Sequence, residues 1–238
     1  MHQPIPLSDR AIITICGPDR KHFLQGLITN DIEKISETSA LYAAMLTPQG
    51  KYLHDFFISE MGDTLYLDGE RDRLPDLFRR LMMYKLRADV DITDCSDKYT
   101  ILSSPNRLTD GLVCYADPRH PQMGFRTIQT IMDDKTDDEY DRLRLALGLP
   151  DGSRDFHIDR TLILEGNMEQ LNGVDFDKGC YVGQEVTARM KYRASLKKRL
   201  LPVNVDGDLP ERGTAITDDT GKKIGDIRSG RDNMAIGY

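Results

Sequence analysis

Short apolar runs rich in β-branched residues recur through the first third of the chain and are separated by turn residues. The runs cover residues 11–16, 41–46, 51–59 and 64–68. Runs of this length and composition are typical of β-strands. Tight turns that contain Pro48, Gly50 and Gly62 join the last three runs, so we expect an antiparallel meander.

Helical periodicity follows these runs. Helices are expected over residues 72–87, 137–147 and 180–193, and a shorter helix is expected to begin at Pro18. Further strands are expected over residues 88–94, 99–103, 112–115 and 126–131, and, as a small C-terminal β domain, over 200–205, 214–217, 222–228 and 235–238. The pattern predicts an α+β protein. Because the last strand reaches residue 238, a barrel built from this domain is expected to be short of a strand.

Composition narrows the possible functions. The 238 residues suffice for two or three compact units. A net charge of −7 is unlike that of nucleic-acid-binding proteins, so we expect no stable nucleic-acid complex. No apolar stretch approaches the ~20 residues that span a bilayer, and the N-terminal residues show no leader pattern. We therefore expect a cytoplasmic monomer without a membrane partner.

Two features of the residue distribution bear on chemistry. The four cysteines form no C-x-x-C pair and lie in no zinc-type spacing, so neither a metal site nor a disulfide framework is expected. Basic residues gather between Arg189 and Arg199. This run is either a solvated surface or a patch for an anionic ligand or partner.

The densest chemical signal is the segment DKGCYVGQE, residues 177–185. Glycines mark it as a loop that enters a helix, so we expect Cys180 near the helix N-terminus, where the helix dipole favours an anion. Lys178 adds a positive charge, and both effects lower the pKa of a thiol. The alternative is a cysteine that is merely buried at a helix start, and spacing alone leaves both open.

Helical geometry then sorts the following side chains into faces. A polar face is expected to hold Cys180, Gln184, Thr187 and Lys191, and an apolar face that packs on the core is expected to hold Val182, Val186 and Met190. Glu185 and Arg189 are expected to pair across one turn.

The stretch KGCYVGQE resembles the K-G-C-[YF]-x-G-Q-E signature of the YgfZ-type folate-binding proteins. GPDRKHFLQGLITND, TPQGKYLHDF and LEGNMEQLNGVDFDKGCYVGQEVTARMKYR resemble further blocks of that family, so the likeness covers nearly the whole chain. The family is similar to the T-protein of glycine cleavage and to the folate-binding domain of the tRNA-modifying GTPase TrmE.

The resemblance implies a fold and a division of the chain. Two interleaved units of antiparallel sheet and helix would surround a central folate hole, followed by a small C-terminal β-barrel. The units would comprise residues 1–50 with 137–195, residues 51–136, and residues 196–238 for the barrel.

The resemblance also implies a function. The chain would bind tetrahydrofolate or a one-carbon derivative and support the assembly or repair of iron–sulfur enzymes, with iron–sulfur client or assembly proteins as partners. Cys180 and Lys178 are the candidate catalytic residues. Residues that would contact the folate are Asp55, Glu165, Tyr181, Gln184 and Arg189. Of these, Glu165 matches the glutamate that binds the pterin in T-protein relatives, and a carboxylate can accept its paired N–H donors.

Two other functions stay open. Asp55 matches the region of the T-protein catalytic aspartate, but His54 stands where that motif has a second acid, which counts against an aminomethyl or other one-carbon transferase. Strand alternation is expected to place Asp55 on the face opposite Tyr52. The third possibility is a module that ligates a cluster transiently, which would need ligands from a partner because clusters take four thiolates.

Overall fold

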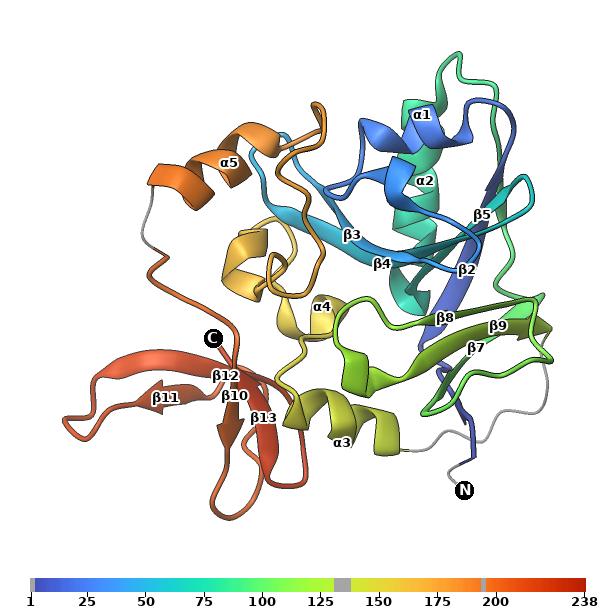
Figure 1. Ribbon diagram of the computed structural model, residues 1–238. Helices are drawn as coiled ribbons and strands as arrows, with labels where there is room; N and C mark the ends of the chain where they lie inside the picture. The colour runs from blue at the N-terminus through green and yellow to red at the C-terminus, as the bar shows by residue number, and fades with distance from the viewer. Residues whose placement is uncertain (1–2, 131–137, 194–195) are drawn as a thin grey trace.

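The computed structural model describes residues 3–130, 138–193 and 196–238. Within these residues lie three antiparallel sheets (Figure 1). The first contains β2 (Arg10–Cys16), β3 (Leu41–Leu46), β4 (Tyr52–Met61), β5 (Thr64–Glu70) and β6 (Asp91–Asp94) in the order β3-β4-β5-β2-β6. The second contains β1 (Ile5–Pro6), β7 (Tyr99–Ser104), β8 (Val113–Ala116) and β9 (Phe125–Thr130) in the order β1-β7-β9-β8.

The third sheet is C-terminal and lies beside the rest of the molecule (Figure 1). Its strands are β10 (Leu201–Asn204), β11 (Ala215–Thr217), β12 (Lys223–Arg231) and β13 (Met234–Gly237), in the order β10-β13-β12-β11. In the described part of the chain β10 and β11 remain at the two ends of this order. The four strands therefore form an open sheet and do not close into a barrel.

Helices connect the sheets and cover one of them. The α-helices are α1 (Arg20–Gln25), α2 (Leu74–Lys85), α3 (Glu139–Ala146), α4 (Gly152–Asp155) and α5 (Gln184–Arg193), and the 3-10 helices are η1 (Ile32–Lys34), η2 (Arg71–Arg73), η3 (Pro121–Met123) and η4 (Ile163–Gly166). None of the described helices combines the length and hydropathy that crossing a bilayer requires.

These elements confirm the predicted α+β class and the meander of β3, β4 and β5. The helix expected over 72–87 is α2, and a 3-10 turn precedes it. The expected end of a strand at Ile131 and the expected start of a helix at Asp137 lie outside the described residues. The division into three units stays a prediction.

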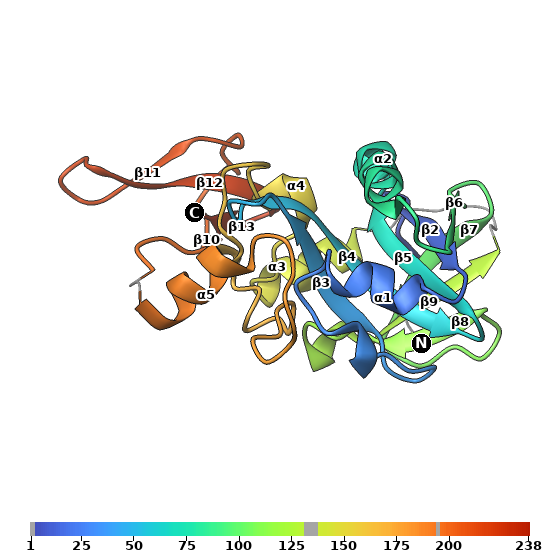
Figure 2. The ribbon, with the colours of Figure 1, turned by 90° about the horizontal axis from the view of Figure 1, so that it is seen from above.

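The five-stranded sheet has an apolar core on each face. One face packs against α1 and α2 through side chains such as Leu24, Leu77 and Leu81. Figure 2 shows both helices against this sheet. The other face carries Tyr42 and Phe57 and belongs to a second core that includes residues of the β1-β7-β9-β8 sheet. The sheet is therefore a central layer that is buried on both sides.

A β-bulge in β4 changes the alternation of its side chains. Met45 pairs with His54, but the next residue of β3, Leu46, pairs with Tyr52, so Leu53 is the extra residue. Tyr52 consequently belongs to the same core as Phe57, while Leu53 belongs to the other. The expectation that Tyr52 and Asp55 would point to opposite faces was wrong, because strict alternation holds only without an inserted residue.

The space between the first two sheets contains buried charges. The Asp68 carboxylate accepts hydrogen bonds from Arg10 at 2.7 Å and from Arg126 at 2.6 Å. The Arg126 guanidinium also lies 4.0 Å from the centre of the Phe57 ring. Such a buried network is stable only when each charge is paired, so it fixes how the two sheets pack.

Candidate functional site

The loop that leads into α5 carries the most exposed thiol of the protein. Cys180 is exposed, whereas Cys95 is buried and Cys16 and Cys114 are partly buried, and all four cysteines are free. Cys180 does not belong to a helix, because α5 begins at Gln184. The expected helix over 180–193 was therefore wrong at its start, and the thiol lies in the loop before the helix.

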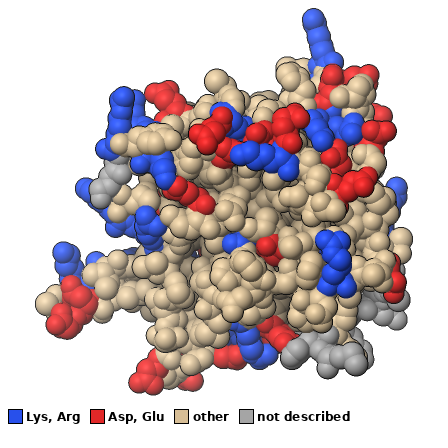
Figure 3. All heavy atoms as spheres, viewed as in Figure 1, with Lys and Arg blue, Asp and Glu red and all other residues tan. Residues whose placement is uncertain are grey.

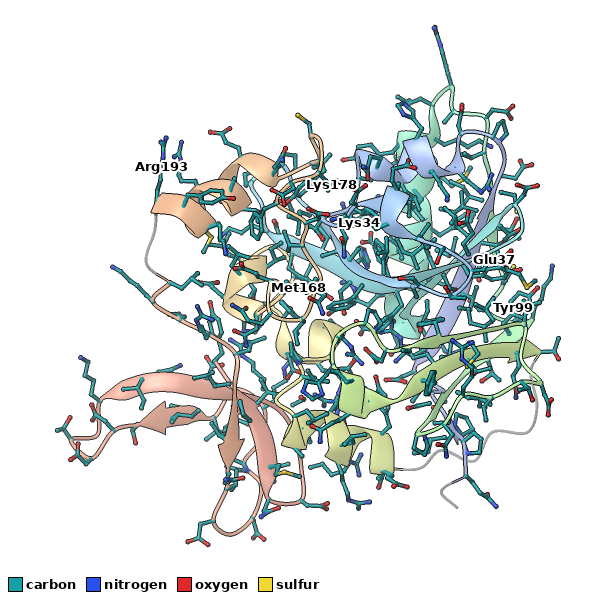
Figure 4. The ribbon with its side chains drawn as sticks, viewed as in Figure 1. Lys34, Glu37, Tyr99, Met168, Lys178 and Arg193 are labelled. Atoms are coloured by element: carbon teal, nitrogen blue, oxygen red, sulfur yellow. The ribbon has the colours of Figure 1, made fainter. Side chains whose placement is uncertain are left out.

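Lys178 anchors this loop to the N-terminal part of the chain. Its Nζ donates three hydrogen bonds of 2.7 Å to the backbone carbonyls of Gln25, Ile28 and Asn30. Figure 4 shows Lys178 between the loop and that segment. Burial lowers the pKa of Lys178 to about 8, against the opposing effect of the Asp31 carboxylate. The ammonium is thus used to hold the loop in place.

A second anchor lies on the other side of the thiol. Tyr181 is buried, which raises the pKa of its hydroxyl to about 12, and Val182 N–H donates to the Gly26 carbonyl at 3.1 Å. Gly183 has a φ of +86° and packs against the turn between β3 and β4, with Thr47 O only 2.7 Å from where a Cβ would stand. This contact explains why α5 begins only after Gly183.

The side chains of α5 differ in burial from the two faces that we expected. Thr187 is the buried residue of this helix, and its hydroxyl donates to the Gly183 carbonyl at 3.2 Å. Gln184 is half-buried at the helix start, while Arg189 is exposed and lies 3.4 Å from Glu185. The predicted pair of Glu185 and Arg189 is confirmed, but the polar face with Cys180 and Thr187 is not formed.

An open pocket of about 520 Å³ adjoins the loop, a volume typical of small-ligand sites. Asp175, Phe176 and Asp177, just before Lys178, contribute to its walls together with Lys34 and Tyr42. Burial opposes ionisation of Asp175, but its hydrogen bond with the Lys34 ammonium holds the pKa of this carboxyl below its ordinary value. None of the five residues expected to contact folate lines this pocket.

Asp55 lies in the interior, between two tyrosines. Its carboxylate accepts hydrogen bonds from the Tyr42 hydroxyl at 2.8 Å and from the Tyr52 hydroxyl at 2.6 Å. Burial and then the charge of Asp55 raise the pKa of both tyrosines well above 10. The Tyr52 ring stacks on Phe156 at 4.4 Å. Each oxygen of Asp55 thus has a partner within the protein.

Glu165 lies where the C-terminal sheet contacts the rest of the chain. Its Oε2 accepts hydrogen bonds from Leu162 N–H at 3.0 Å and from the Tyr238 hydroxyl at 2.9 Å. The carboxylates of Glu165 and Asp55 therefore accept hydrogen bonds from different groups of the protein. None of the described pockets is lined by any of the five residues predicted to contact folate.

The residues that position the thiol were missed in the sequence analysis. They are the carbonyl-bearing residues 25–30 and the turn formed by Thr47 and Gly50. Both segments lie in blocks that we compared with the family, GPDRKHFLQGLITND and TPQGKYLHDF. The signal was that these two blocks occur together with the block that contains the loop, because both of them contact the loop in the fold.

Basic side chains gather over α5 and the segment after it (Figure 3). The exposed basic residues there are Arg189, Lys191, Arg193, Lys197, Lys198 and Arg199. Lys191 pairs with Glu169. Among the described residues, no group of three or more His, Cys, Asp or Glu side chains is placed to hold a metal ion.

The sequence and the fold are both similar to those of known proteins. Residues 7–104 match the model of the GCVT N-terminal domain, and residues 197–238 match the model of the CAF17 C-terminal beta-barrel domain. The structure is similar to the glycine cleavage system aminomethyltransferase T from Bartonella henselae, with a TM-score of 0.77 and 15% identity over 99% of this chain and 77% of that one. At this identity the likeness concerns the fold alone.

Curated relatives share more of the sequence. The Homo sapiens iron-sulfur cluster assembly factor IBA57, mitochondrial, is 30% identical over 97% of this chain and 75% of its own length. The Neurospora crassa homolog is 31% identical over 86% of this chain but only 54% of its own length. The chain spans about half the length of the first curated relatives that it matches.

The names of these relatives correct one expectation. The human, mouse and fungal relatives are named mitochondrial, which contradicts the cytoplasmic location that we expected. That expectation rested on the composition of the N-terminal residues. Receptors recognise targeting segments independently of the folded domain, so the composition of the domain does not determine the compartment.

Proposed function

The chain belongs to the YgfZ/CAF17 family of iron–sulfur cluster assembly factors that includes IBA57, and from this membership we propose that it supports iron–sulfur protein assembly through the Cys180 thiol. In this proposal Cys180 binds an iron atom of a cluster that a partner protein carries. The cluster is cargo that passes through the complex.

One observation supports this role above the others: an exposed thiol sits on a loop that is anchored on both sides. Lys178, two positions before Cys180, is bound to three backbone carbonyls, and Tyr181 and Gly183, which follow Cys180, are packed against the fold. A ligand held in one place loses little conformational entropy on binding. The thiol is thus accessible and its position is fixed by the fold.

The number of thiols argues for a partner. An iron–sulfur cluster generally takes four protein ligands, mostly thiolates. The other three cysteines of this chain are partly or fully buried. Cys180 would therefore supply one ligand, and the partner or a small thiol would supply the others.

The ligand exchange conserves charge and electrons. The Cys180 thiol loses its proton as the sulfur–iron bond forms, and the thiolate that it displaces from the same iron takes up a proton as it leaves. No electron is transferred, so the step needs neither an oxidant nor a reductant. Lys178 takes no part in it, because its ammonium is bound to three carbonyls.

Tetrahydrofolate does not enter this proposal. Asp55 and Glu165, the carboxylates expected to bind it, accept hydrogen bonds from tyrosines of the protein. Tyr181 is buried and Arg189 faces solvent, so we base the proposal on the thiol and not on a folate. The same arrangement disfavours a one-carbon transferase, because Asp55 is enclosed and His54 bonds to Asp76 on the other side of the strand.

The test is complementation of a strain that lacks the protein. Cys180→Ser should fail to restore the activities of iron–sulfur enzymes, whereas Cys114→Ser, a partly buried cysteine away from the loop, should restore them. Both variants should accumulate to the wild-type level. Full restoration by Cys180→Ser would refute the proposal. Formation of methylene-tetrahydrofolate from an aminomethyl donor would support the transferase instead.

A further inference from the structure

The C-terminal end of α2 exposes apolar side chains on the face that points away from the sheet. Leu74, Leu77 and Leu81 form the buried face of the helix. Met82 and Met83 lie on other faces and are 44% and 63% exposed. An ordinary surface helix has one apolar face, so a second one calls for a reason.

The residue that ends α2 extends this stripe. Leu86 is 87% exposed and has a φ of +43°, a conformation that a leucine rarely adopts. It follows Met82 and Met83 by four and three positions, so the three exposed side chains belong to the last turn and the C-cap of the same helix end. Leu86 thus combines an unfavourable backbone conformation with a solvent-exposed apolar side chain. Backbone strain of this kind is concentrated at functional sites.

This end of the helix is also basic. Residues 79–87 contain four Lys or Arg and no acid, although the chain as a whole has a net charge of −7. Asp76 is shared by Arg73, Arg79 and Arg80. Lys85 lies 4.0 Å from Asp91, and Arg87 has no ion pair within the described residues. On α2 itself the apolar stripe is therefore bordered by basic side chains, while the exposed Asp89 and Asp91 lie in the segment that follows.

The shape of the region limits what can cover it. The segment after α2 forms the uppermost loop of the molecule in Figure 1, and basic atoms project from the top of Figure 3 with acidic atoms beside them. Met82, Met83, Tyr84 and Leu86 are all exposed, and residues 79–87 line none of the five described pockets, so we treat this surface as a ridge. A protein would need a matching socket for a ridge, whereas lipid adapts to its shape.

We propose that this end of α2 inserts into the surface of an anionic lipid bilayer. Met82, Met83 and Leu86 would enter the boundary between headgroups and acyl chains, and the bordering cations would contact phosphate groups. Tyr84, which is 42% exposed, has the amphipathic ring that is favoured at this depth. The binding is peripheral, so it differs from the membrane spanning that the sequence argued against.

Vesicle co-sedimentation tests the proposal with the full chain. Vesicles of phosphatidylcholine with about one-third phosphatidylglycerol should bind it at low salt, and vesicles of pure phosphatidylcholine should bind it weakly. Arg87→Gln should weaken binding about five-fold, the effect of one cation near such a surface. Met83→Ser with Leu86→Ser should weaken it about ten-fold or more. The matched control Ile224→Ser, at an exposed isoleucine of β12, should bind like the wild type.

A fluorescent variant gives a second measurement. The chain contains no tryptophan, so Leu86→Trp introduces a single indole. Its emission should shift to the blue on anionic vesicles, whereas that of Ile224→Trp should not. The proposal would be overturned if the wild type did not bind the vesicles, or if the double serine variant bound them equally well. If the wild type did not bind vesicles but the double serine variant lost cellular function, the ridge would be assigned to a protein partner. Cys180→Ser should bind vesicles normally, which separates this test from the test of the thiol.

Discussion

Tyr52 donates a hydrogen bond of 2.6 Å to Asp55, although the two residues are three positions apart on one β-strand. A regular strand would point them to opposite faces. The bulge at Leu53 brings both to the face that Tyr42 also occupies, and Tyr42 donates the second hydrogen bond to the carboxylate. A charged group is thereby buried with both of its oxygens paired.

Tyr52→Phe tests the importance of this pair. The substitution keeps the ring and removes one donor from a buried carboxylate, so we expect the free energy of unfolding to fall by about 1.5–3 kcal/mol. Urea denaturation measures it. Tyr192→Phe, at a tyrosine that is 69% exposed, is the control and should change it by less than about 0.5 kcal/mol. Equal stability of the two variants would mean that the bond contributes nothing.

The two glycines that flank the thiol should respond differently to alanine. A Cβ at Gly183 would stand 2.7 Å from the Thr47 carbonyl, and the φ of +86° is itself unfavourable for alanine. Gly183→Ala should therefore lower the free energy of unfolding by about 2 kcal/mol or more. A Cβ at Gly179 meets nothing within 4 Å, so Gly179→Ala should be nearly neutral. Thermal denaturation of both variants checks this, and a neutral Gly183→Ala would contradict the packing of the loop on the turn.

Lys178→Met should separate positioning of the thiol from its chemistry. The variant keeps the stem of the side chain and leaves three carbonyls without their donor, which should lower the free energy of unfolding by about 2–4 kcal/mol. Amide hydrogen exchange of residues 179–183 should become faster, although Cys180 is intact. Lys34→Met, which removes a lysine that is 59% exposed, should change stability by less than about 1 kcal/mol. Unchanged exchange in the loop would show that the lysine does not hold it.

His54 should make stability depend on pH. Its burial, with a further effect of Arg73, lowers its pKa from 6.5 to about 4. Between these values the unfolded chain binds a proton that the folded protein does not, so stability falls as the pH decreases. From about pH 7.5 to about pH 5 the loss from this residue is about 2 kcal/mol.

Urea denaturation at both pH values checks the effect of His54. His54→Gln should lose about 2 kcal/mol less than the wild type over this interval. His22→Gln, at an exposed histidine of α1, should lose as much as the wild type. The pKa of Asp76, the partner of His54, is held below its ordinary 3.8 chiefly by hydrogen bonds that outweigh its burial, so it titrates below this interval. Equal losses in all three proteins would exclude the histidine as the cause.

Local pattern predicted the regular elements well. Alternation and turn chemistry placed β2, β3 and β5 to within about two residues, and the four strands of the C-terminal sheet were each found. These signals are short in range, because a strand or a turn is determined by its own residues. The family resemblance supplied the arrangement of the elements, which periodicity does not contain.

The site was harder to predict because long-range contacts determine it. The periodicity of residues 180–193 indicated a helix from Cys180 onward, but burial of Tyr181 and the turn at Gly183 delay its start. Lys178 was expected to influence the thiol by its charge. Its actual partners are carbonyls 148 to 153 positions earlier in the chain, which no local pattern reveals.

That separation between Lys178 and its carbonyl partners has a consequence for biosynthesis. The carbonyls of Gln25, Ile28 and Asn30 leave the ribosome 148 to 153 residues before the lysine that joins them. A nascent or misfolded chain therefore has a cysteine but no rigid loop to present it. Only molecules in which Lys178 has already reached these carbonyls therefore present the sulfur on an ordered loop.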